Sequence, residues 1–225
     1  MLLAIDTATR TLSLALHDGQ QIQAEMTWET GNQHTVELLP AIQQMFIRQK
    51  IMATDLTLLA VSQGPGSFNG LRIGFSTAKG LALSLAIPLI AIPTLDVIAA
   101  AQPSADHTLL AVVQAGRGRV CAGSYQWGVG RWIAQNDTKI AAWQTILDSI
   151  EGETTISGEI DAEGRAAIEQ ALSVGKPLHV ASPAYALRRA GFLADLAWQR
   201  WHDSPGDEAL TAVPLYLHQP GVPHP

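Results

Sequence analysis

The chain has 225 residues, with 14 Lys and Arg against 20 Asp and Glu and a formal net charge of −6. This length accommodates one large domain or two small ones, and the acidic balance argues against a protein that binds nucleic acid through a basic face of its own. A single cysteine, Cys121, excludes an internal disulfide and a cysteine-based metal cage.

The first hundred residues alternate between strand and helix patterns. Apolar or alternating runs predict strands at 2–5, 11–16, 21–28, 57–62 and 88–92. Apolar residues at helical spacing predict helices at 33–49, 71–85 and 94–101. The resulting order is β-β-β-α-β-α-β-α.

The second half repeats this order more loosely, after a polar stretch with a proline at 102–106. Strands are predicted at 109–114, 118–126, 132–139, 154–157 and 177–180, and helices at 143–150, 162–172 and 182–203. We expect domains at 1–101 and 107–217 and a mobile tail at 218–225. Whether the last helix packs back on the first domain is left open.

The repeated order is that of the actin-like, sugar-kinase and Hsp70 nucleotide-binding (ASKHA) fold. We therefore predict an α/β protein of two such domains, the second more degenerate. In that fold an Asp-x-Thr/Ser turn between the first two strands approaches the phosphates of a nucleotide. Asp6 and Thr7 occupy that place here.

A glycine-rich turn at 62–74 joins a predicted strand to a predicted helix. Such a turn can hold phosphate, because the amides at a helix N-terminus point at the anion and glycines lack the Cβ atoms that would block it. The spacing matches neither of the two common phosphate loops, so a structural turn is an equal alternative. The candidate nucleotide-facing residues, vestigial or shared with a partner, are Asp6, Thr7, Gly64, Gly66, Ser67 and Gly70.

The residues do not support catalysis by this chain alone. His34 has no second histidine one helical turn away, and with Glu37 it makes a poor metal site. We expect His34 at a surface or an interface, Ser67 as a helix cap and Cys121 as a packed thiol. We therefore predict no catalytic residue and no metal site.

The apolar runs are too short to span a bilayer, since the longest, 81–92, is interrupted by Ser84 and Pro88. Residues 1–6 have no basic region, from which we expect no signal peptide. The sequence therefore predicts a soluble, cytoplasmic protein with no membrane partner.

Several motifs together resemble the TsaB (YeaZ-like) family. They lie at 4–9, 33–35, 38–40, 64–74, 79–82, 93–95 and 214–217. The resemblance is dense over 1–98 and sparse afterwards, and Gly-Pro-Gly-Ser-Phe-Asn-Gly at 64–70 is its most specific part. The chain departs from the family pattern at Gln114, where an acid is usual, at Arg119, where Glu is usual, and at His218, where Arg is usual.

The resemblance implies a non-catalytic subunit that binds and activates a TsaD-like enzyme for N6-threonylcarbamoylation of the adenosine 3′ of the anticodon in tRNA. A TsaE-like ATPase joins the pair, tRNA is reached through the complex, and ATP and a metal ion are expected on the partner subunits rather than on this chain. In isolation the family forms homodimers through the two helices of the first domain, with much the same surface that holds TsaD. The candidate interface residues are His34, Leu38, Ile42, Met45, Arg72, Phe75, Ser76 and Lys79.

Two alternatives stay open. One is an enzyme of the same fold, either a small ATP-dependent kinase or a degenerate relative of a metal-dependent peptidase. A kinase would keep Asp6 to position a metal ion or water, although Gln114 stands where its second phosphate loop is expected. The other is a homodimeric interaction protein with no role in tRNA.

Overall fold

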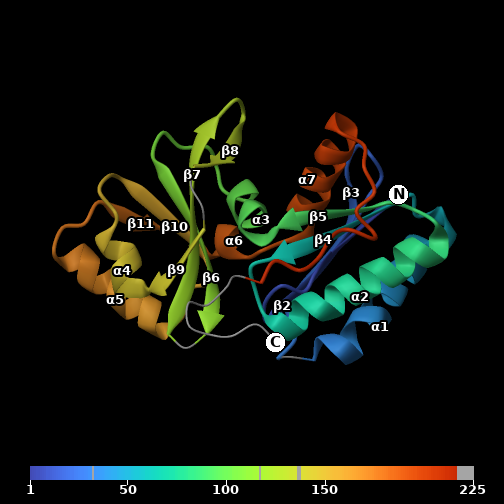
Figure 1. Ribbon diagram of the computed structural model, residues 1–225, viewed down its shortest axis with the longest axis horizontal. Coiled ribbons are helices and arrows are strands. Elements are labelled where there is room, and N and C mark those ends of the chain that lie inside the picture. Colours follow the sequence, from blue (N-terminus) through green and yellow to red (C-terminus); the bar gives the residue numbers. More distant parts are fainter. Residues whose placement is uncertain (32, 117, 136–137, 217–225) are drawn as a thin grey trace. The chain divides into compact units, whose positions relative to one another are not determined.

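The computed structural model describes residues 1–31, 33–116, 118–135 and 138–216 (Figure 1). It divides into two compact units. The first contains Met1–Val97 and Arg188–Pro214, and the second contains Ile98–Leu187 with Leu215 and Tyr216. The tail expected at 218–225 lies outside the described residues, as does His218.

The first unit is built on a five-stranded sheet in the order β3-β2-β1-β4-β5. Its strands are β1 (Leu2–Asp6), β2 (Thr11–His17), β3 (Ile22–Glu29), β4 (Leu58–Gly64) and β5 (Leu89–Pro93). β2 runs antiparallel to β1 and β3, whereas β1, β4 and β5 run parallel. Parallel neighbours need crossover connections, and α1 (His34–Gln49), η1 (Ala53–Asp55), α2 (Phe68–Leu85) and α3 (Thr94–Ala100) lie along the chain between or after these strands.

Helices cover both faces of this sheet (Figure 1). Leu3 and Ile5 of β1 pack in the cluster that contains α1 and α2. Leu2 and Ala4 of the same strand pack in the cluster that contains α7 (Ala190–Asp203). Successive side chains of a strand point to opposite faces, so burial on both faces explains why β1 reads as a continuous apolar run.

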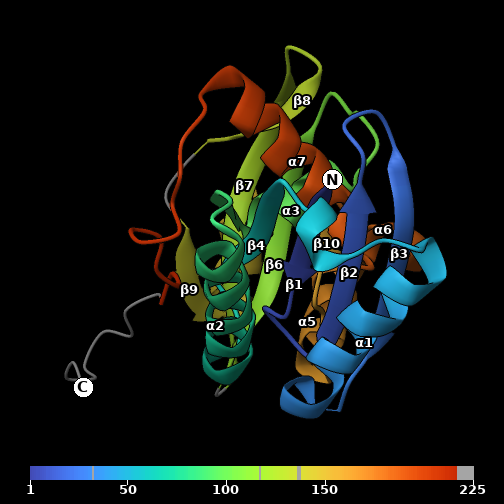
Figure 2. The same cartoon turned by 90° about the vertical axis from the view of Figure 1, so that its right-hand side faces the viewer.

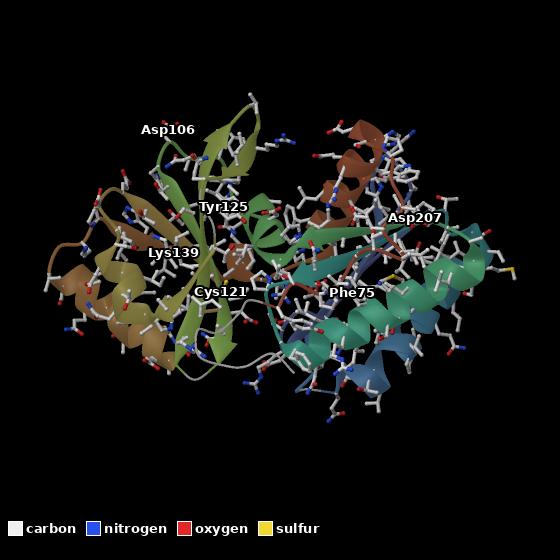
Figure 3. The ribbon with its side chains drawn as sticks, viewed as in Figure 1. Phe75, Asp106, Cys121, Tyr125, Lys139 and Asp207 are labelled. Carbon is white, nitrogen blue, oxygen red and sulfur yellow. The ribbon has the colours of Figure 1, made fainter. Side chains whose placement is uncertain are left out.

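The segment after α7 lies along β5, an edge strand of the sheet (Figure 3). The backbone N–H of Glu208 donates to the carbonyl of Leu89 at 2.9 Å. The carboxylate of Asp207 accepts from Leu89 N–H at 3.1 Å, and that of Glu208 accepts from Ala91 N–H at 3.0 Å. These bonds satisfy edge groups that an uncovered strand would offer to other chains.

The second unit has a six-stranded sheet in the order β11-β10-β6-β7-β8, with β9 also paired to β7. Its strands are β6 (Thr108–Gly116), β7 (Arg119–Gly128), β8 (Arg131–Ala134), β9 (Lys139–Ala142), β10 (Thr154–Gly158) and β11 (Leu178–Val180). Its helices are α4 (Trp143–Asp148), α5 (Ala162–Ser173) and α6 (Pro183–Ala186). α4 and α5 bury one face of the sheet around Trp143 and Ile156. The repeated order of strands and helices confirms the predicted actin-like α/β fold.

Two predicted elements are wrong in extent. The single strand expected at 132–139 is two strands, because β8 pairs with one end of β7 and β9 with the other. The single helix expected at 182–203 is α6 in the second unit and α7 in the first. It is interrupted because Leu187 and Arg189 adopt extended backbone conformations.

No helix in the described ranges combines the length and the apolar character that crossing a membrane requires.

Candidate functional site

Asp6 ends β1, and its carboxylate is fully buried. It accepts hydrogen bonds from the backbone N–H of Ala8 at 2.9 Å and from the hydroxyl of Ser62 at 2.9 Å. The buried guanidinium of Arg188 donates from Nε to Asp6 at 2.5 Å and from Nη2 to the hydroxyl of Thr9 at 2.9 Å. The negative charge of this turn is therefore balanced by the chain itself, as a buried carboxylate requires.

The glycine turn packs directly on the residues that follow Asp6. The hydroxyl of Thr7 donates to the carbonyl of Gly70 at 2.7 Å. A Cβ atom at Gly66 would lie 2.1 Å from the carbonyl oxygen of Ala8, and one at Gly70 would lie 2.2 Å from that of Thr7. At Gly74 the added atom would lie 2.3 Å from Thr7 Oγ1. These glycines therefore make room for the chain's own backbone and side chains.

Other polar groups of the turn are also used internally. Ser67 caps α2 by accepting from Gly70 N–H at 3.3 Å, and its own N–H donates to the carbonyl of Ala8 at 2.6 Å. The N–H of Gly64 donates to the hydroxyl of Thr94 at 3.1 Å. The six residues predicted to face a nucleotide thus lie in one packed turn, where they contact other residues of the same chain. They do not fit a nucleotide phosphate or its metal ion at this turn.

Two of the three glycines inside α2, Gly74 and Gly80, provide a matched test of this packing. We expect Gly74→Ala to destabilise the protein by about 2 kcal/mol, because the new methyl group forces Thr7 off its bond to Gly70. Gly80 has nothing within 4 Å of its virtual Cβ, so Gly80→Ala should stabilise the protein by about 1 kcal/mol through helix propensity. Urea-induced unfolding measures both changes, and two changes of the same sign would contradict the packing described above.

His34, which was predicted at a surface or an interface, is buried at the start of α1. Burial lowers the pKa of its imidazole. Its Nδ1 lies 3.4 Å from the hydroxyl of Thr30, and its Nε2 has no hydrogen-bond partner among the described residues. Glu37, the other candidate ligand, accepts from the indole of Trp28 at 2.6 Å. No group of three or more potential metal ligands is found within the described part of the chain.

The predicted interface residues separate into two sets. Leu38, Ile42, Met45 and Phe75 are buried in the core of the first unit (Phe75 is labelled in Figure 3). These four residues and His34 are therefore core residues rather than interface residues. The apolar stripe of an amphipathic helix faces its own sheet. The other three lie at the surface or are half-buried: Arg72, Ser76 and Lys79.

Sequence reasoning missed the apolar residues that α1 and α2 expose. These two helices face the viewer in Figure 2. Four aliphatic side chains on these two contacting helices are more than half exposed: Val36, Leu39, Ile47 and Leu83. The spacing of these residues in the sequence could have indicated the exposed surface. Val36, Leu39 and Ile47 share one outward stripe of α1, and Leu83 continues the stripe of Arg72 and Ser76 on α2. Exposed apolar residues grouped on neighbouring helices mark an interaction surface.

In the second unit, the positions that depart from the family pattern lie on β6 and β7. The side-chain amide of Gln114 donates to the carbonyl of Glu159 at 3.3 Å, and its backbone N–H donates to the Glu159 carboxylate at 3.3 Å. Arg119 begins β7 and is half-buried. Cys121 is buried, and burial raises the pKa of its thiol to about 12. It is a packed thiol, since nucleophilic cysteines need a lowered pKa.

Comparisons with known proteins agree on one family. The family model described as TsaD, tRNA N6-adenosine threonylcarbamoyltransferase, matches residues 27–187. The tRNA threonylcarbamoyladenosine biosynthesis protein TsaB of Bacillus subtilis (strain 168) is 34% identical over 149 residues, 65% of each chain. The protein of the same name from Escherichia coli (strain K12) is 37% identical over 127 residues, 56% of this chain and 54% of that one. The matched regions thus span less than two thirds of these relatives.

A solved structure extends the likeness of fold to nearly the whole chain. The structure of YeaZ from Pseudomonas aeruginosa superposes with a TM-score of 0.78 at 24% sequence identity. The superposition covers 96% of this chain and 99% of that one.

Proposed function

The chain belongs to the TsaB (YeaZ-like) family, within the wider family that the TsaD model describes, and we propose that it acts in the biosynthesis of threonylcarbamoyladenosine in tRNA. Its proposed role is that of a non-catalytic subunit that binds and activates a TsaD-like enzyme. The names of its curated relatives support the pathway. The Asp6 turn and the surface of α1 and α2 support the role.

The ion pair between Arg188 and Asp6 is the observation that carries this proposal. Enzymes of the actin-like fold use the turn after the first strand to approach phosphates, whereas here that carboxylate is buried and bound by a guanidinium at 2.5 Å. Opening the turn would separate these two buried charges, which costs several kcal/mol. This cost argues against the ATP-dependent kinase and supports a subunit without its own turnover.

The proposed partner surface is the exposed face of α1 and α2. It presents Val36, Leu39, Ile47 and Leu83. On α2, Arg72 holds its guanidinium over the ring of Phe68 at 5.1 Å. Apolar side chains together with arginine are typical of protein interfaces. We propose that a TsaD-like subunit binds this face and that a second copy of the chain binds it when TsaD is absent.

The remaining components are proposed for the partner subunits. A TsaE-like ATPase would join the complex, and ATP and the metal ion would bind to the partners rather than to this chain. The net charge of −6 supports contact with tRNA through the complex, since phosphate binding draws on Lys and Arg.

A reconstitution experiment tests this role. The chain and the TsaD-like and TsaE-like proteins of the same organism are purified. Transfer of the threonylcarbamoyl group from its adenylate to tRNA is then measured with and without this chain. We expect transfer only in the complete mixture and co-purification of the chain with the TsaD-like protein. Transfer or ATP hydrolysis by this chain alone would favour the enzyme alternative, and failure to associate would favour the homodimeric interaction protein.

A further inference from the structure

The second unit contains a cavity of about 380 Å³ that the function proposed above does not use. Its lining comes from the start of β6 and the segment before it, from β8, β10, β11 and α6. Ligand sites in proteins typically begin near this volume, at about 300 Å³. The lining residues that carry the argument are Gln102, His107, Trp132, Thr155, His179 and Tyr185.

Hydrogen bonds fix the walls of this cavity. The buried amide of Gln102 donates to the carbonyl of Tyr185 at 2.8 Å, and its own backbone carbonyl accepts from the indole N–H of Trp132 at 3.3 Å. One buried glutamine thus connects the two segments that supply aromatic rings. On the sheet, Nε2 of His107 lies 2.7 Å from the hydroxyl of Thr155. A site that is held in this way needs little ordering on binding, which favours affinity.

The charges around the cavity restrict the kind of ligand that it can bind. None of the described residues that line it is Lys, Arg, Asp or Glu. A phosphate or carboxylate ligand would therefore lack the cationic partner that anion sites use. The nearby carboxylate of Glu153 lies 3.3 Å from Nε2 of His179 and 3.9 Å from Nδ1 of His107, so it adds negative charge beside the two imidazoles.

We propose that this cavity binds an uncharged, flat aromatic molecule with a polar edge, the chemistry that nucleobases and nucleosides present. The rings of Trp132 and Tyr185 would stack on the flat face. Apolar surface from Leu109 and Val180 would cover its body, and the hydroxyl and imidazole groups would meet its edge. This inference is independent of the proposed partner and needs no TsaD-like protein.

Calorimetric titration of the full chain with adenosine and with AMP tests the proposal. We expect adenosine to bind with a dissociation constant on the order of 0.1 mM, from the affinity per atom usual for ligands of this size. AMP should bind more weakly, because its phosphate finds no cation. Tighter binding of AMP than of adenosine, or no saturation by adenosine below about 1 mM, would overturn the proposal.

Three variants test whether adenosine binds in this cavity. Tyr185→Ala removes an exposed ring and should weaken adenosine binding about tenfold, whereas Ala105→Trp should fill the cavity and abolish it. Val174→Ala is the control, since this exposed residue of the same unit does not line the cavity. Circular dichroism confirms folding of each variant. Equal affinities in all three variants would place adenosine elsewhere and overturn the proposal.

Discussion

Replacing Arg188 by methionine is expected to destabilise the first unit by about 3–5 kcal/mol. The substitution leaves the carboxylate of Asp6 buried without its cationic partner and removes the bond to Thr9. Because the ion pair joins the start of α7 to the end of β1, the loss of stability should be largest where these two elements pack. Urea-induced unfolding gives the total change, and hydrogen exchange of the β1 amides shows where it falls.

Two further variants test whether the loss of stability comes from leaving the Asp6 carboxylate buried without its cationic partner. Arg189, the next residue, is about half exposed and pairs with Glu25, so Arg189→Met should cost at most about 1 kcal/mol. The double variant Asp6→Asn with Arg188→Met removes both charges and should recover much of the loss. Similar losses for the two arginines would mean that the Asp6 turn does not depend on its ion pair.

Local pattern was enough to predict the strands and helices of the first hundred residues. The strands there are bounded by turns and the helices carry a single apolar stripe, so periodicity alone identified the elements and their order. The same information could not show which side of α1 and α2 stays uncovered. Phe75 was assigned to a partner surface although it packs on the chain's own sheet, because an apolar stripe has the same spacing whichever surface covers it.

The remaining errors depend on contacts between residues far apart in sequence. The break between α6 and α7 places Arg188 against Asp6, 182 residues away. Arg188 and Arg189, two adjacent charges inside an apolar helical pattern, could have indicated this break. The division of 132–139 into β8 and β9 depends on pairing with both ends of β7, which no local window contains. The role of the glycines beside Thr7 also became clear only from the packed turn.

Placing charges on the exposed face of α1 and α2 is expected to abolish association while leaving the fold intact. Leu39→Glu and Leu83→Glu alter side chains that are more than half exposed, so each should change the free energy of unfolding by no more than about 0.5 kcal/mol. If this face is the interface, each buries an unpaired carboxylate in the complex and should weaken binding at least about 100-fold. Sedimentation of the isolated chain and co-purification with the TsaD-like protein measure the two associations.

The control for these variants is Leu172→Glu on α5 of the second unit. This leucine is also exposed, so the substitution adds the same charge to a helix outside the proposed surface. Association should survive in this variant, and the reconstituted transfer of threonylcarbamoyl groups to tRNA should survive with it. If all three variants lose association, the effect comes from added negative charge on an already acidic protein. If only the α5 variant loses it, the partner binds the second unit and the assignment of α1 and α2 is wrong.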